Sequence, residues 1–84
     1  MAKYIADIDV MPLKALLDPQ GKAVTGSMKN LNLSEIDNVR IGKHITLEVS
    51  ANDDASAHAK VDEACKKLLC NQIMEFYEFR LTKI

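Results

Sequence analysis

The densest group of chemically capable side chains in the sequence is His58, Asp62 and Cys65. Their spacing of i, i+4 and i+7 places all three on one flank of a predicted helix, and all three residue types can bind zinc. No fourth ligand follows at a suitable spacing, and Cys65 borders an apolar stripe, where a free cysteine acts as a small hydrophobe. We therefore predict no metal here. A thiol or metal protein that uses Cys65 and His58 remains the weakest of three interpretations.

Other catalytic patterns are incomplete. Gly21-Lys22 is similar to the end of a phosphate-binding loop, but the upstream glycine is missing and Ala23 stands where Ser or Thr would hold magnesium. Cys65 and Cys70 lack the spacing of a redox pair, and His44 alternates away from the core side of its predicted strand. No catalytic residue is predicted in this chain.

Composition narrows the class of protein further. The chain has 84 residues, of which 48% are hydrophobic and 27% charged, and its formal net charge is −1. It lacks the basic patch of a nucleic-acid binder and the apolar run of a membrane span. Two cysteines on one predicted helix favour free thiols and a reducing compartment, so we expect a cytoplasmic protein that binds neither nucleic acid nor membrane.

The elements that position these groups follow from periodicity and caps. Asp18 before Pro19 predicts the N-cap and first position of a helix, and Asn32 is typical of its left-handed end. Gly21 in the first turn costs helix propensity, which points to a close contact there. A glycine at Gly42-Lys43 between two short alternating runs indicates a hairpin.

The predicted elements are a strand at 3–13, a helix at 19–31, strands at 39–41 and 44–49, a helix from about 52 to 70, and a last strand at 73–82. The order βαββαβ predicts a single α+β domain, residues 1–84, of the ferredoxin-like two-layer type. Its four-stranded antiparallel sheet would carry both helices on one face. In the second helix, Ala57, Val61, Ala64 and Leu68 form the expected buried stripe.

Two surfaces of this fold are candidates for association. The last strand carries apolar residues on both sides, and Met74, Phe76 and Ile84 are the candidates for self-association. Arg40 and Lys43 flank the predicted hairpin tip, where they would face solvent or contact an acidic group of a partner.

Three segments together resemble a known family. The runs Leu17–Val24 (LDPQGKAV), Val39–Lys43 (VRIGK) and Lys67–Asn71 (KLLCN) are similar, in order and spacing, to the PurS family, the small subunits of phosphoribosylformylglycinamidine synthase. The resemblance covers about residues 8 to 80. It implies a βαββαβ fold and a non-catalytic subunit of a ligase complex in purine biosynthesis.

The resemblance also implies partners. In that family, a glutaminase subunit releases ammonia and a large ATP-dependent synthetase uses it to convert formylglycinamide ribonucleotide into the amidine. The small subunit is expected to be a homodimer or dimer of dimers that bridges the other two and assists ammonia transfer. It holds no cofactor itself, while ATP and magnesium belong to the synthetase. The expected partner contacts are Asp18, Pro19, Gln20, Gly21, Lys22, Arg40, Gly42 and Lys43.

An alternative from another class remains open. A stand-alone ferredoxin-like homodimer could sense a small metabolite bound between its subunits. In the bridging interpretation, Asp18–Lys22 is a turn that presents Gln20, Gly21 and Lys22 to another protein.

Overall fold

The computed structural model describes residues 1–84 and contains one three-stranded sheet and two α-helices. The elements are β1 (Ala2–Pro12), α1 (Pro19–Asn30), β2 (Lys43–Ala51), α2 (Asp54–Ala64), a π-helical turn η1 (Cys65–Leu69) and β3 (Glu75–Lys83). The predicted α+β class is therefore confirmed. None of the helices combines the length and apolar character needed to cross a membrane.

Strand β1 lies at the centre of the sheet, in the order β2-β1-β3, and pairs antiparallel with both neighbours. Its residues alternate as the sequence predicts, and Tyr4, Ala6, Ile8 and Val10 are all buried on one face. Apolar residues of β2 and β3 stand beside them on that face, with Ile45 and Phe79 both opposite Ile8. This row is the core of the protein.

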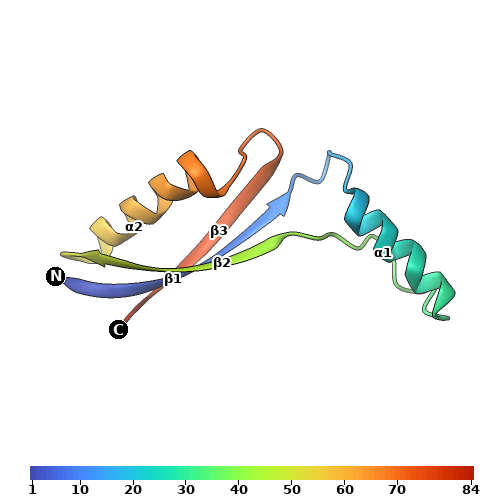
Figure 1. Ribbon diagram of the computed structural model, residues 1–84, viewed down its shortest axis with the longest axis horizontal. Coiled ribbons are helices and arrows are strands. Elements are labelled where there is room, and N and C mark those ends of the chain that lie inside the picture. Colours follow the sequence, from blue (N-terminus) through green and yellow to red (C-terminus); the bar gives the residue numbers. More distant parts are fainter.

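Helix α2 covers the apolar face of the sheet (Figure 1) and buries Ala57 and Val61 against it. Asp53 caps the helix by accepting a hydrogen bond from the Ser56 amide at 2.8 Å, close to the start at about residue 52 that the sequence predicts. We call the three strands, α2, η1 and the following Cys70 the body.

The predicted buried stripe of α2 is wrong at its end. The Cys70 amide donates to the Cys65 carbonyl at 2.9 Å, a bond of the π-helical type that widens the last turn. The wider turn shifts the inward face by one position, so Cys65 and Cys70 are buried while Leu68 is 83% exposed.

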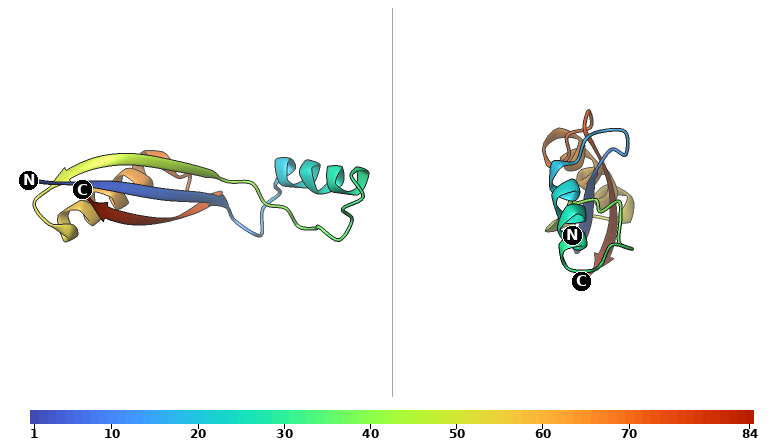
Figure 2. Two further views of the ribbon diagram at one scale, coloured as in Figure 1. Left: turned by 90° about the horizontal axis from the view of Figure 1, so that it is seen from below. Right: turned by 90° about the vertical axis from the view of Figure 1, so that its right-hand side faces the viewer.

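Helix α1 does not lie on the sheet. It lies beyond the ends of the strands, at the opposite end of the molecule from both termini (Figures 1 and 2). We call residues 18–41, which comprise α1 and the segment that returns from it, the arm. The prediction of two helices on one face of a ferredoxin-like sheet is therefore wrong for this chain.

The predicted hairpin at Gly42-Lys43 is also wrong. Residues 39–42 form no strand, and the chain runs on from them into β2 without reversing (Figure 1). Gly42 allows a close approach to β1 and does not form a turn, because a Cβ there would overlap the Val10 carbonyl oxygen and the Met11 sulfur. The sheet consequently has three strands rather than four.

The resulting shape is extended. The radius of gyration is 16.6 Å, against about 12 Å for a compact domain of this length. The accessible surface is 5968 Å², whereas a compact monomer of 9.4 kDa exposes about 5,000 Å². Roughly 1,000 Å² of surface is therefore exposed beyond what a globule of this size requires.

Candidate functional site

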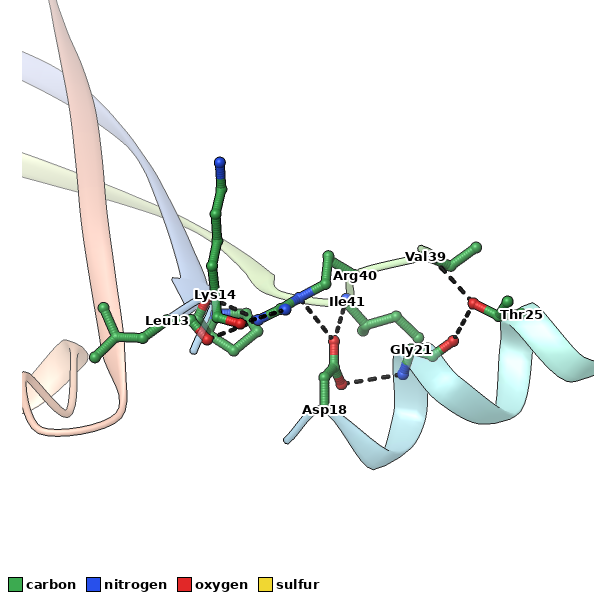
Figure 3. A network of polar contacts seen from close by, with 9 residues as sticks. Leu13, Lys14, Asp18, Gly21, Thr25, Val39, Arg40 and Ile41 are labelled. Atoms are coloured by element: carbon green, nitrogen blue, oxygen red, sulfur yellow. Dashed lines mark hydrogen bonds and ion pairs between the residues drawn. The ribbon is translucent and has the colours of Figure 1, made fainter. Parts of the chain in front are cut away.

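Asp18 and Arg40, two of the polar residues singled out in the sequence, meet where the arm joins the body (Figure 3). Helix α1 contributes its first two turns, the returning segment contributes residues 39–41, and the end of β1 contributes backbone carbonyls. We call the hydrogen-bonded group of Asp18, Gly21, Thr25, Arg40 and the carbonyls of residues 12–14 the joint.

Asp18 connects the two segments of the arm. Its Oδ1 accepts from the Gly21 amide at 3.0 Å, which is the predicted N-cap bond, and its Oδ2 accepts from the Ile41 amide at 3.0 Å. The Gly21 and Ile41 amides, followed by the Arg40 charge, hold the pKa of Asp18 below its usual value. One carboxylate thus begins the helix and fixes the returning segment beside it.

Gly21 allows these segments to approach each other closely. It is the one buried residue of α1, and a Cβ there would overlap the Val39 carbonyl oxygen. One turn later, the Thr25 hydroxyl donates to the Gly21 carbonyl at 2.8 Å and accepts from the Val39 amide at 3.0 Å. The contact role predicted for Gly21 is therefore met inside the chain.

Arg40 fastens the arm to the body. Its guanidinium donates to the carbonyls of Leu13 at 2.8 Å, Pro12 at 3.2 Å and Lys14 at 3.3 Å. Its Nε also lies 3.6 Å from Asp18 Oδ2. The planar fork of arginine suits several acceptors at once, and a lysine could not reach all of them. Arg40 is half-buried, so the interpretation of a solvent-facing charge at a hairpin tip is wrong.

Two open grooves flank the joint. One of about 500 Å³ lies between α1 and the returning segment, and its rim includes Lys22, Gly26 and Lys29. The other, of about 300 Å³, lies between the joint and the loop before β3, where Met74 and Glu75 line it. Lys22, Lys29 and Asp37 all line the first groove, and none of the three forms an ion pair, so the groove carries free charge of both signs.

The structure divides the predicted contact residues into two groups. Asp18, Gly21, Arg40 and Gly42 are engaged in contacts within the chain, whereas Pro19, Gln20, Lys22 and Lys43 are exposed. Thr25 was missed. A threonine one turn after a glycine at a helix start does not by itself indicate a functional residue. The second partner of the Thr25 hydroxyl is the Val39 amide, which comes from a distant part of the sequence.

The three self-association candidates are all exposed but do not form one patch. Phe76 lies on the face of β3 away from α2, opposite Met11 of β1, and Met74 precedes the strand. Ile84 follows the other end of β3, where its amide donates to the Lys3 carbonyl. About 25 Å of strand separates Ile84 from Phe76.

The cluster of His58, Asp62 and Cys65 is dispersed among separate contacts. His58 lies against Phe79, with ring centroids 4.8 Å apart, and Cys65 is fully buried. Asp62 accepts a short hydrogen bond from the Tyr77 hydroxyl, which raises the pKa of Tyr77 to about 12. No three His, Cys, Asp or Glu side chains gather closely enough to hold a metal ion.

His44 lies on the open face of the sheet, as its alternation predicts. Its Nδ1 is 2.6 Å from Asp9 Oδ1 and its Nε2 is 3.5 Å from Asp7 Oδ1. The two carboxylates, Asp9 first, raise the pKa of His44. The imidazole thus links β1 to β2 and has no nucleophile beside it.

These features define an open α+β domain with a helical arm fixed away from its own sheet. A family model described as PurS, phosphoribosylformylglycinamidine (FGAM) synthase, matches residues 5–83. The chain therefore belongs to the PurS family.

Individual relatives agree with this assignment. The chain is 39% identical over 81 residues to the phosphoribosylformylglycinamidine synthase subunit PurS of Synechocystis, an alignment that covers 96% of this chain and 81% of the relative. It is 32% identical to the same subunit of Bacillus subtilis, with coverage of 96% and 95%. The extended shape recurs in solved structures. PurLQS from Thermotoga maritima contains a chain that matches with a TM-score of 0.89 and 32% identity, over 98% of this chain and all of that one.

Proposed function

We propose that this chain acts as the small subunit of phosphoribosylformylglycinamidine synthase and bridges its glutaminase and synthetase subunits. In that role it assists the transfer of ammonia during glutamine-dependent formation of the amidine. The observation that carries this proposal is the fixed arm. Asp18 and Arg40 form hydrogen bonds with the backbone of the chain itself, and the outer surface of the arm remains available to other proteins.

The joint explains why the arm suits a bridging role. Asp18 and Arg40 use their polar atoms within the chain, so the orientation of α1 is set before any partner arrives. Preorganisation of this kind reduces the entropy lost on association. The exposed Gln20 and Lys22 then stand on a rigid helix start and are the residues that we assign to partner contact, together with Lys43.

The reaction itself belongs to the partners. ATP and magnesium would be held by the large synthetase, and this chain contributes no catalytic residue or cofactor. We expect a homodimer or a dimer of dimers inside the complex. The free, buried thiols of Cys65 and Cys70 suit the reducing cytoplasm, where we place the assembly.

The test is reconstitution. The purified chain is mixed with the glutaminase and large synthetase from the same source, and glutamine-dependent amidine formation is followed. We expect activity with glutamine to require this chain, while activity with added ammonia depends on it less. Full glutamine-dependent activity of the other two subunits alone would contradict the proposal.

A metabolite-sensing homodimer is the second candidate, and the groove beside α1 is the observation that favours it. A volume of about 500 Å³ lined by Lys22, Lys29 and Asp37 would admit a small charged metabolite. Sensing requires a metabolite that raises the melting temperature of the chain by itself, because a ligand that prefers the folded state stabilises it. Activity restored by reconstitution without any such ligand favours the bridging role.

A further inference from the structure

The smaller groove beside the joint lies where three connecting segments meet. These are the segment before α1, the end of the arm and the loop before β3. Apolar side chains from all three line it, among them Pro12, Leu16, Leu17, Ile41 and Met74. Its volume of about 300 Å³ is near the lower limit of pockets that bind small molecules.

Hydrogen bonds hold the loop that forms one wall of this groove. The Asn71 carbonyl accepts from the amides of Met74 at 2.9 Å and Glu75 at 2.7 Å, and the Glu75 side chain accepts from the Asn71 amide at 2.9 Å. The Leu13 amide donates to the Met74 carbonyl at 2.9 Å, which ties the loop to the segment before α1. The walls are therefore in place before an occupant arrives, so binding has few groups to order.

Large apolar side chains on these fixed segments are exposed. Leu17 is 69% exposed and Met74 52%, while Ile73, which precedes Met74 and does not line the groove, is 84% exposed. None of the three packs on the core of the body. A small molecule in the groove would leave Ile73 in water, whereas a protein segment could cover all three. Neighbouring exposed apolar side chains of this kind mark protein contacts.

The free charge around the groove is positive. Asp18 and Glu75, its two carboxylates, already accept backbone amides of the chain. Lys14 extends away from the joint (Figure 3), and Lys43 follows the groove residue Ile41 by two positions. Both lysines are exposed and neither forms an ion pair. They complement carboxylates on a partner, although the chain as a whole has a net charge of −1.

We propose that this groove binds a segment of one of the two larger synthase subunits, in which an apolar side chain is flanked by carboxylates. The apolar side chain fills the space between Leu17 and Met74, and the carboxylates pair with Lys14 and Lys43. The apolar contact supplies most of the affinity, while the lysines set the rate and specificity of association. This rests on the proposed function and deepens it by naming a docking surface and the chemistry of its occupant.

The first test measures the dissociation constant of the chain for each purified partner by isothermal titration calorimetry. Met74→Asp puts a carboxylate among the apolar walls and should weaken binding to one partner about 100-fold. Ile84→Asp, at an exposed apolar position beyond the other end of β3, is the matched control and should change the constant less than about threefold. Binding that Met74→Asp weakens no more than Ile84→Asp does would overturn the proposal.

Charge reversal tests the lysines with substitutions that bury nothing. Lys14→Glu combined with Lys43→Glu should weaken the same binding about tenfold at low ionic strength, and less at 1 M salt, where the Debye length is about 3 Å. Lys83→Glu, exposed and unpaired at the end of β3, should change it less than about twofold. An equal loss per charge in Lys83→Glu would assign the effect to net charge and contradict a local contact.

Photo-crosslinking identifies the occupant. A chain with Ile73→Cys carries a benzophenone maleimide, and the wild-type chain serves as the blank because Cys65 and Cys70 are buried. The crosslink in the assembled synthase should fall on a partner segment with an apolar side chain next to Asp or Glu. A crosslink to a second copy of this chain, or to a basic segment, would overturn the proposal.

These outcomes separate the groove from the role in the synthase. If the wild-type chain binds a partner and supports glutamine-dependent activity, but the groove and lysine variants bind as wild type does, the groove is refuted and the bridging role stands. If the wild-type chain binds neither partner, the proposed function fails together with the groove.

Discussion

The body and the arm are held in shape by different forces. Of the ten buried residues, nine are apolar side chains of the body and one is Gly21 in the arm. The body is stabilised by burial, whereas the arm is fixed by hydrogen bonds from Asp18, Thr25 and Arg40 to the backbone. A small chain can thus hold a helix in a defined direction without packing it on a core.

The largest effect should come from the body. Ile8 is fully buried at the centre of the core, so Ile8→Ala should lower the free energy of unfolding by about 2–5 kcal/mol. Leu17, directly before the arm, is 69% exposed, and Leu17→Ala should change the free energy of unfolding by less than about 0.5 kcal/mol. Urea denaturation measures both. Equal losses would contradict the division between body and arm.

A smaller effect is expected from the close contact in the arm. Gly21→Val places a side chain against the Val39 carbonyl and should destabilise the arm by about 1–3 kcal/mol. Hydrogen exchange would show α1 amides exchanging faster while β1 stays protected. The matched control is Gly26→Ala, where a Cβ meets nothing within 4 Å, and it should stabilise α1 by up to about 1 kcal/mol. If Gly21→Val left the exchange of α1 unchanged, the joint would not govern the arm.

Acid should loosen the arm before it unfolds the body. The pKa of Asp18 is lowered in the folded protein, so its contribution is present above the unfolded value of about 3.9 and is lost as pH falls through the folded pKa. The pKa values of Asp9, Asp62 and Glu63 in the body are lowered too, but the partners of these carboxylates are side chains, whereas Asp18 holds the backbone of two segments together. Exchange of α1 amides, corrected for intrinsic rates, should therefore rise below about pH 4 while β1 remains protected. Asp18→Asn should remove this acid step.

The smallest effect on stability should come from His44 on the open face of the sheet. Its contribution should be lost as pH rises, whereas that of Asp18 is lost as pH falls. The pKa of His44 is raised by Asp9 and Asp7, so its contribution is complete below the unfolded value of about 6.5 and is lost as pH rises through the folded pKa. The melting temperature should fall slightly from pH 6 to pH 9. In His44→Gln this decline should be weaker, and an equal decline would assign it to other groups.

Local signals in the sequence were sufficient for the caps. Asp18 begins α1 with Pro19 in its first turn, Asp53 caps α2, and Asn32 adopts the predicted left-handed conformation with φ of 61°. Each of these depends on a few neighbouring residues. The alternation of β1 was equally clear because both of its faces contrast in polarity.

Features that depend on distant contacts could not be read in the same way. Gly42 between two short β-type runs is typical of a hairpin, yet its missing Cβ makes room for the Val10 carbonyl of another strand. Nothing in the sequence around Arg40 indicates that its partners are the backbone carbonyls of residues 12–14. The exposure of Leu68 follows from one π-helical bond, which helical periodicity does not anticipate.

The role of the joint can be measured in the reconstituted synthase, by following activity as a function of added chain for wild type and for Arg40→Ala. In the proposed role, the joint serves association and not chemistry. Arg40→Ala should therefore reach the same maximal rate of glutamine-dependent amidine formation, at about tenfold higher half-saturating concentration because the arm is no longer preorganised. Superimposable curves, or a lower maximal rate at an unchanged half-saturating concentration, would contradict it.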